Sequence, residues 1–407
     1  MTGRYVQRTI ESELLAAARE FPVVILTGPR QTGKSTLLRH LFSDHAYLSL
    51  DDPFQVTLAR QDPVRFLANL GPRAVIDEIQ YAPGLLPYIK LAVDEGRRDT
   101  GAYVLTGSQF FPVMAGVTES LAGRAAVYEL LGLSWEETGV PDRPDLPACF
   151  GRLFTGFFPD PLVHGVERNR YYASYLRTYL ERDLRQILFV QDLTLFQSFI
   201  ELLAARAGSI LNLNAVAGEC GVSFSTAKRW LSLLESTRIV YLLRPFHRNI
   251  TKRVVKSPKL YFTDTGLLAY LQRYPDPVTL QHGPMAGAFF ESMIVTEALK
   301  WRLNHNARVE LFFFRDSNGN EIDLVLDAGP RCLLVETKLT ATLRLEHVKT
   351  LVSQRGWFGN ARGVLLSFAE TTAAVADGVD CLPWPRLYDL LAESASTQEP
   401  QPPARGS

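Results

Sequence analysis

The sequence predicts an α/β protein whose first domain is a parallel β-sheet with crossover helices. Five short apolar runs are typical of buried strands, and the residues between them follow the spacing of amphipathic helices. A glycine-rich loop follows the first run and leads into a helical stretch. Short strands that alternate with helices are typical of parallel sheets. The predicted strands cover residues 22–27, 46–50, 74–76, 102–106 and 126–131.

Length and composition indicate a globular protein of several domains. The chain has 407 residues, of which 46% are hydrophobic and 21% charged, and its formal net charge is zero. Because proteins that coat nucleic acid are usually basic, any such contact is expected from local patches. The four cysteines are far apart, which argues against a zinc site or a disulfide framework. The N-terminal stretch does not have the pattern of a signal peptide and no apolar run could cross a bilayer, so we expect a cytoplasmic protein without membrane contact.

The loop after the first strand carries a phosphate-binding pattern. Residues 23–35 read VVILTGPRQTGKS, which matches G-x-x-x-x-G-K-[ST]. Glycines let the backbone N–H groups face phosphate oxygens, and the helix N-terminus adds positive potential. Lys34 is expected to reach the β- and γ-phosphates of ATP, and the Ser35 hydroxyl to ligate Mg²⁺. The residues expected to bind the nucleotide are Gly28, Pro29, Arg30, Gln31, Thr32, Gly33, Lys34, Ser35 and Thr36.

Two later strands end in polar residues that fit the same site. The run 74–76 leads into Asp77, expected to hold Mg²⁺ through water, and Glu78, expected to polarise the attacking water as general base. The next strand leads into Ser108 and Gln109, and we choose Ser108 as the sensor of the γ-phosphate. The plainer alternatives are that the acidic pair starts an ordinary loop and that Ser108 lies in a simple turn.

Arg124 precedes the fifth predicted strand and has two possible roles. It could be an arginine finger that reaches the γ-phosphate bound by a neighbouring subunit, which would raise the rate by orders of magnitude. It could equally pair with a nearby acid. The finger requires neighbours, so it predicts a homo-oligomeric ring, such as a hexamer.

The combination of these stretches resembles one group of bacterial and archaeal proteins. The segments TGPRQTGKSTLL, RAVIDEIQ, VLTGSQ and LAGRAAVYELLGLSWEE are similar to its AAA+-type ATPase domain, which is followed by a C-terminal domain of unknown function. YLRTYLERDL, PKLYFTDTGLLAYL and GAFFESMIVTEALK are also similar, so the resemblance covers nearly the whole chain except the tail. It implies an ATPase and leaves the cellular role open.

Residues 213–245 predict a winged helix. One short helix ends before Gly221, which suits a left-handed turn, and a second begins after Ser223 as its cap. The strand at 239–243 would then begin a wing. The alternatives to nucleic-acid contact are a lid or protein-contact module beside the ATPase, and plain solvated surface. The basic residues expected to contact nucleic-acid phosphates are Lys228, Arg229, Arg248, Lys252 and Arg253.

The stretch EIDLVLDAGPRCLLVETK, residues 321–338, predicts a hairpin with charged residues on both strands. Asp323, Glu336 and Lys338, with Glu291 on the preceding helix, are similar to the core of PD-(D/E)xK nucleases. Two carboxylates on adjacent strands could share one Mg²⁺, and Lys338 lies on the same strand face as Glu336. Lys338 could then orient water or stabilise charge at phosphorus. The alternatives are a related fold that only binds nucleic acid, and hairpin ends that merely pair with each other.

Together these patterns predict three domains and a tail. They are an AAA+-type ATPase domain over 1–165, a helical and winged-helix region over 166–275, a restriction-endonuclease-like α/β domain over 276–392, and a disordered tail over 393–407. The expected function is an oligomeric, Mg²⁺-dependent ATPase that remodels or processes DNA, such as branched DNA. Two alternatives stay open: a nucleotide-controlled regulatory switch with a protein-binding C-terminal domain, and an ATP-regulated, metal-dependent DNA nuclease.

Overall fold

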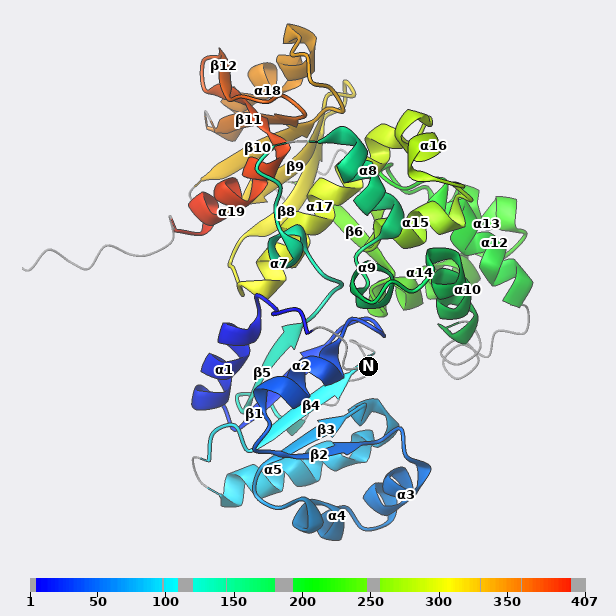
Figure 1. The fold of residues 1–407 in the computed structure, drawn as a ribbon, viewed down its shortest axis with the longest axis vertical. Coiled ribbons are helices and arrows are strands. Elements are labelled where there is room, and N and C mark those ends of the chain that lie inside the picture. The colour runs from blue at the N-terminus through cyan, green and yellow to red at the C-terminus, as the bar shows by residue number, and fades with distance from the viewer. Residues whose placement is uncertain are drawn as a thin grey trace, which may run out of the picture.

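The computed structural model places a small parallel sheet with its helices at one end of the molecule and a larger α/β part at the other (Figure 1). It describes residues 5–96, 99–108, 120–143, 145–179, 193–246, 257–329, 331–359 and 361–396. Gln109, Arg248, Lys252 and Arg253, for which roles were expected from the sequence, lie outside these ranges, as does the tail from residue 397.

The first sheet contains five parallel strands in the order β2-β3-β4-β1-β5. Every residue of β1 and β4 is buried, as is usual for parallel strands with helices on both faces. Because β4 lies between β1 and β3, the loops that follow these three strands meet at one edge. The strands are β1 (Val23–Thr27), β2 (Ala46–Ser49), β3 (Ala74–Asp77), β4 (Tyr103–Gly107) and β5 (Ala125–Glu129), and the helices are α1 (Glu11–Glu20), α2 (Lys34–Leu41), α3 (Pro53–Gln61), α4 (Pro63–Leu70) and α5 (Leu86–Glu95).

The middle region is helical and contains the helix-turn-helix expected from the sequence. Gly221 has a φ of 73° at the turn, and the Ser223 hydroxyl accepts a hydrogen bond from the Thr226 N–H at the start of α14. Trp230 of α14 packs edge-on against both Phe196 and Phe199, so it belongs to the core. The helices are α7 (Trp135–Thr138), α8 (Leu146–Thr155), α9 (Pro159–Val163), α10 (Arg168–Tyr179), α12 (Leu193–Ala204), α13 (Leu213–Cys220), α14 (Phe224–Ser236), α15 (Thr265–Leu271) and α16 (Pro277–His282).

The hairpin that follows α14 joins the middle region to the C-terminal sheet. Its strands β6 (Val240–Pro245) and β7 (Lys259–Phe262) are antiparallel, and β6 also pairs in parallel with β8. The resulting sheet has eight strands in the order β12-β13-β11-β10-β9-β8-β6-β7. The other strands are β8 (Glu310–Arg315), β9 (Glu321–Asp327), β10 (Cys332–Thr337), β11 (Arg362–Ser367), β12 (Ala373–Ala376) and β13 (Val379–Pro383), with helices α17 (Ala286–Asn304), α18 (Lys349–Gln354) and α19 (Leu387–Ser396).

One hydrophobic core extends from Leu131 to Leu391, so the predicted middle and C-terminal domains pack as one body. Helix α17 lies across this core and is buried over most of its length. After β10 the chain forms a 3-10 turn, Leu345–Val348, which leads into the short helix α18. Helix α19 continues to Ser396, four residues into the segment expected to be a disordered tail.

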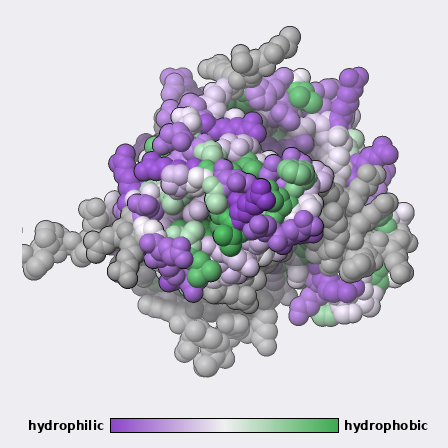
Figure 2. All heavy atoms as spheres, turned by 90° about the horizontal axis from the view of Figure 1, so that it is seen from below, coloured by the Kyte–Doolittle hydropathy of each residue, from purple (hydrophilic) through white to green (hydrophobic). Residues whose placement is uncertain are grey.

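The small end of the molecule exposes several large apolar side chains. Figure 2 views this end from below and shows apolar atoms gathered among polar ones. Phe54, Val64 and Leu91, which belong to α3, α4 and α5, are 69%, 64% and 55% exposed. Among the described residues no helix has both the length and the apolar character needed to span a bilayer.

Candidate functional site

The glycine loop lies between β1 and α2, at the carboxyl edge of the first sheet. Gly28 has a φ of 142°, and a Cβ there would lie 2.0 Å from the carbonyl oxygen of Leu130. The close approach of the loop to the backbone after β5 therefore requires glycine. The Lys34 ammonium donates to the carbonyl oxygens of Gly28, at 2.9 Å, and Pro29, at 2.7 Å. Burial lowers the pKa of Lys34 to about 8, although Glu78 and Asp77 oppose the change.

Asp77 is buried at the end of β3 and accepts hydrogen bonds from three hydroxyl groups. The Ser35 hydroxyl donates to it at 2.8 Å, as expected for two residues that share one Mg²⁺. Tyr47 of β2 and Thr106 of β4 also donate to Asp77. Burial, followed by the bond to Asp77, raises the pKa of Tyr47 to about 12. Neither residue was predicted from the sequence, because the contact of each with Asp77 depends on β2 and β4 flanking β3 in the sheet.

Glu78 adopts a left-handed backbone conformation, with a φ of 60°. This conformation is costly for a residue with a side chain, and such strain is found most often at functional sites. The Thr106 hydroxyl accepts a hydrogen bond from the Glu78 N–H at 3.1 Å. The Gln80 amide donates to the Glu78 carboxylate and also to the Ser108 hydroxyl, at 3.0 Å. Gln80, which the sequence analysis did not single out, thus connects the predicted base with the predicted sensor.

Lys34, Ser35 and Glu78 line a cavity of about 420 Å³ that is partly closed by the middle region. This volume is within the usual range for small-molecule sites. Tyr175 and Thr178 of α10 line the cavity opposite the glycine loop. The sequence analysis noted the segment that contains these two residues but gave neither residue a role. The residues that line this cavity are Arg30, Gln31, Gly33, Lys34, Ser35, Thr36, Asp51, Glu78, Tyr175 and Thr178.

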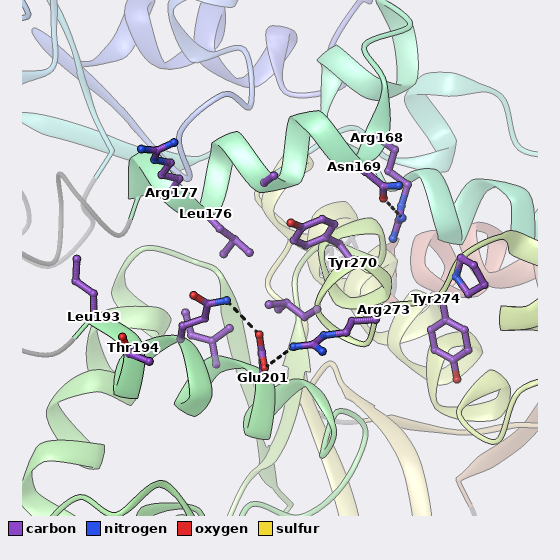
Figure 3. A pocket seen from close by; sticks show the side chains of 15 residues that line it. Arg168, Asn169, Leu176, Arg177, Leu193, Thr194, Glu201, Tyr270, Arg273 and Tyr274 are labelled. Carbon is purple, nitrogen blue, oxygen red and sulfur yellow. Dashed lines mark hydrogen bonds and ion pairs between the residues drawn. The ribbon is translucent and has the colours of Figure 1, made fainter.

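Helix α10 also borders a second cavity of about 710 Å³, which is shared with α12 and α15 (Figure 3). Arg168 in this cavity bonds Asn169 at 2.8 Å, and Arg273 lies 3.5 Å from Glu201. Arg168, Arg273 and Glu201, which are labelled in Figure 3, thus already have polar partners within the protein. Helix α10 therefore lines both cavities.

Arg8, near the N-terminal end, supports the glycine loop from behind. Its guanidinium donates to the carbonyl oxygen of Thr32 at 2.8 Å and of Leu131 at 3.0 Å. It also forms an ion pair with Glu137 at 2.8 Å, and both side chains are buried. Arg8 therefore fixes the loop to the segment that leads into the larger part of the molecule.

Arg124 lies far from the glycine loop of its own chain. It precedes β5, which runs parallel to β1, so it lies at the amino edge of the sheet whereas the loop lies at the carboxyl edge. Its guanidinium makes two bonds to Asp94 of α5, at 2.5 and 3.1 Å. Both side chains are partly exposed, at 36% and 40%. Within one chain, Arg124 is therefore part of an ion pair.

Of the basic residues expected to contact nucleic acid, the structure describes Lys228 and Arg229. Both lie exposed on α14, the second helix of the helix-turn-helix. Helix α14 begins with the Ser223 cap, and its opposite face packs into the core through Ala227 and Leu231. The two basic side chains therefore point away from the body of the protein.

The four residues of the predicted nuclease-like site come together in the C-terminal sheet. β9 and β10 pair antiparallel with Val335 opposite Leu324, which brings Asp323 and Glu336 side by side. Asp323 accepts bonds from the Thr337 N–H and hydroxyl, at 2.9 and 2.8 Å. Lys338 lies 2.8 Å from Glu336. Burial, followed by the charge of Asp323, raises the pKa of Glu336 to about 8.

Glu291, the fourth residue, reaches this group from α17 and brings an unexpected neighbour. The Lys259 ammonium of β7 lies 2.8 Å from Glu291, 2.5 Å from Glu321 and 3.5 Å from Asp323. Burial alone would lower the pKa of Lys259, but the three carboxylates outweigh it and raise that pKa. We call Glu291, Glu321, Asp323 and Glu336 the carboxylate cluster.

Comparisons with known proteins match the chain in three stretches. Residues 20–139 match the family described as AAA domain. Residues 148–277 and 286–387 match two families described as domains of unknown function, DUF8612 and DUF4143. The first sheet with its glycine loop is thus a P-loop ATPase domain of the AAA+ type, as expected from the sequence.

Two mycobacterial proteins are similar along most of the chain. The uncharacterized proteins Rv2008c of Mycobacterium tuberculosis and Mb2031c of Mycobacterium bovis are each 31% identical over 339 residues. The match covers 83% of this chain and 74% of each relative. Among solved structures, the Walker-type ATPase paby2304 of Pyrococcus abyssi is similar with a TM-score of 0.43 and 14% identity, over 65% of this chain and 94% of that one.

Proposed function

This chain belongs to the family of the two mycobacterial relatives and contains an AAA+-type P-loop ATPase domain, and on that premise we propose that it hydrolyses ATP with Mg²⁺ to drive work on DNA. One observation carries the first half of the proposal. Lys34 and Ser35 at the start of α2 and Glu78 after β3 line one cavity at the carboxyl edge of a parallel sheet, and Asp77 accepts a hydrogen bond from Ser35 beside it. Ligands of open α/β sheets bind at this edge.

The residues present fit a nucleotide with a magnesium ion. Ser35 and Asp77 lie within hydrogen-bond distance and offer the hard oxygen ligands that Mg²⁺ prefers. The ion would neutralise phosphate charge and act as a Lewis acid. The glycine loop presents backbone N–H groups to the phosphates, and Lys34 exchanges its bonds with the loop carbonyl groups for bonds to phosphate oxygens.

The chain's own acid–base chemistry rests on Glu78. Its carboxylate accepts a bond from Gln80, which fixes its direction, and a water that attacks phosphorus would donate its proton to this carboxylate. Ser108, on the other side of Gln80, suits a group that distinguishes ATP from ADP. Tyr175 and Thr178 would transmit this difference to α10 and the larger part of the molecule.

DNA is the proposed target of that movement. The support is the helix-turn-helix, with Lys228 and Arg229 exposed on its second helix. Exposed basic residues on such a helix suit contact with phosphates, which depends on salt and carries little sequence information. The regulatory switch remains the alternative if DNA has no effect on hydrolysis.

A homo-oligomeric ring is proposed from the position of Arg124. At the amino edge of the sheet it is remote from its own glycine loop, so a catalytic role requires a second chain. The exposed Phe54, Val64 and Leu91 at the same end of the molecule offer apolar surface for such contacts.

The C-terminal sheet is proposed to have the PD-(D/E)xK type of fold. In its favour are the element order α17–β8–β9–β10–α18–β11 and the parallel pairing of β10 with β11. Cleavage of DNA has the least support of the three expected functions, because Lys259 lies among the carboxylates.

The test is ATP hydrolysis with Mg²⁺, alone and with single-stranded, duplex and four-way-junction DNA. The proposal expects hydrolysis that Glu78→Gln lowers by orders of magnitude and that at least one DNA form stimulates. Lys228→Ala with Arg229→Ala should weaken that stimulation and reduce the salt dependence of DNA binding. A rate of ATP hydrolysis that no DNA form changes would refute the DNA role and favour the regulatory switch. No hydrolysis under any condition would refute the whole proposal.

A further inference from the structure

The carboxylate cluster has the composition of a metal site, but a lysine ammonium lies among its oxygens. Lys259 Nζ is within 3.5 Å of Glu291, Glu321 and Asp323, which come from α17 and β9. The lysine itself comes from β7, in the hairpin that follows the helix-turn-helix. A positive charge from a different segment therefore occupies the space that these three carboxylates enclose.

A divalent metal ion and this ammonium cannot share that space. Mg²⁺ binds oxygen at about 2.0–2.1 Å, whereas an ammonium and a carboxylate oxygen lie about 2.7–2.9 Å apart. The distance of 2.8 Å from Nζ to Glu291 is that of an ion pair. Like charges in this small volume would also repel each other strongly.

Lys259 is held where it is by its strand and by its neighbours. Its side chain is only 2% exposed. Its backbone pairs with Leu243 of β6 and forms a bridge with Ile210. Tyr261, two residues along β7 and therefore on the same face, donates a hydrogen bond of 2.5 Å to Glu291. Moving the ammonium away would break its ion pairs with all three carboxylates.

Glu321 has a second cationic partner, and Glu336 has a cationic partner of its own. Glu321 lies 3.1 Å from Arg315, and Glu336 lies 2.8 Å from Lys338. Glu336 Oε2 is the one cluster oxygen that is buried without a hydrogen-bond partner in the described structure. A single such oxygen is a poor site for a hard cation that needs several ligands.

We propose that Lys259 takes the place of the divalent metal ion in the carboxylate cluster, so that the C-terminal domain does not cut nucleic acid through a metal. The ion pairs instead bind the hairpin of the helix-turn-helix region to the C-terminal sheet. The proposal concerns the PD-(D/E)xK-type fold proposed above. It is independent of ATP hydrolysis, which uses residues at the other end of the molecule.

Binding of Mn²⁺ to the full-length chain, without nucleotide, tests the proposal. Every protein should carry Asp77→Asn, so that the ATPase site contributes no metal ligand of its own. Four proteins are compared by electron paramagnetic resonance: this background, and the background with Asp323→Asn, with Lys259→Met, or with both changes. Methionine keeps the length and apolar stem of lysine and removes its charge. Labelled DNA with Mg²⁺ or Mn²⁺ in parallel tubes reports scission.

The proposal expects the background protein and its Asp323→Asn variant to bind Mn²⁺ equally weakly, with no scission by either. Lys259→Met should gain a saturable Mn²⁺ site that is lost again when Asp323→Asn is added. Mn²⁺ binding or scission by the background protein that Asp323→Asn removes would overturn the proposal. A folded Lys259→Met protein that gains no site would also overturn it. If Lys259→Met does not fold, the comparison of the first two proteins still decides. ATP hydrolysis by the chain with Asp77 intact is measured separately, so the two proposals fail in distinguishable ways.

Discussion

Replacing Lys34 with methionine is expected to stabilise the nucleotide-free protein at neutral pH, although it removes a lysine of the proposed ATP site. The lysine is 5% exposed, and burial lowers its pKa from 10.5 to about 8. Its partners are the carbonyl oxygens of Gly28 and Pro29, which carry no full charge. The folded protein therefore holds this charge at a cost until phosphate arrives.

The size of the effect follows from two opposing terms. At 1.36 kcal/mol per pKa unit, the change from 10.5 to about 8 corresponds to about 3 kcal/mol of destabilisation at neutral pH. Methionine also loses two hydrogen bonds, each with a net contribution of about 1 kcal/mol. The difference leaves the Lys34→Met protein more stable by about 1 kcal/mol.

The pH dependence gives the sharper test, because the sign of the difference should reverse. Below its folded-state pKa of about 8, Lys34 is charged in both states and the full cost is present. As the pH rises from about 8 toward 10.5, the folded state loses the proton first, so the unfolded state binds more protons and stability rises. Between about pH 7 and about pH 9.5 the native protein should gain about 2 kcal/mol relative to Lys34→Met.

Urea unfolding of both proteins at the two pH values, without nucleotide or Mg²⁺, measures this difference. Lys90→Met on α5 of the same domain is the control and should show no such pH-dependent change. ATP should raise the midpoint for the native protein and leave Lys34→Met unchanged. A Lys34→Met protein that is less stable by the same amount at both pH values would refute the reasoning.

Three further predictions concern other contacts in the structure. Glu78→Gln should lower kcat by about 10²–10⁴-fold in a steady-state assay, with ATP binding retained. Gln80→Ala should lower kcat less, because the Gln80 side chain orients the base but does not accept the proton. Equal losses for the two variants would contradict these roles. Arg124→Ala should lose hydrolysis of ATP. Mixing it with the inactive Glu78→Gln protein should restore part of the activity, because the second chain supplies the arginine. If no activity returns when one protein is titrated into the other, the arginine does not act between chains. Glu297→Gln should lower the free energy of unfolding in urea by about 3–5 kcal/mol, because it leaves the buried Lys300 ammonium 2.8 Å away without its counter-charge. Glu310→Gln, in the exposed pair with Arg302, should lower it by less than about 1 kcal/mol. Similar losses for both variants would show that burial is not decisive.

The sequence alone determined those features whose signal is local. The glycine loop, the acidic pair after β3 and the cap at Ser223 each depend on residues within a few positions of one another, and the structure has them as expected. The same holds for the strands of the first sheet, because a buried parallel strand is a continuous apolar run. The match to the AAA domain family confirms this part of the prediction.

Tertiary structure decided the features that depend on which strands become neighbours. Tyr47 and Thr106 meet Asp77 because β2 and β4 flank β3, and strand order is not encoded in the apolar runs themselves. Tyr175 reaches the cavity beside the glycine loop only because α10 packs over it. Most decisive is Lys259, to which the sequence analysis assigned no role in the carboxylate cluster. The pairing of β6 with β8 places its charge among carboxylates that belong to a different domain family, because ion pairs form through space rather than along the chain.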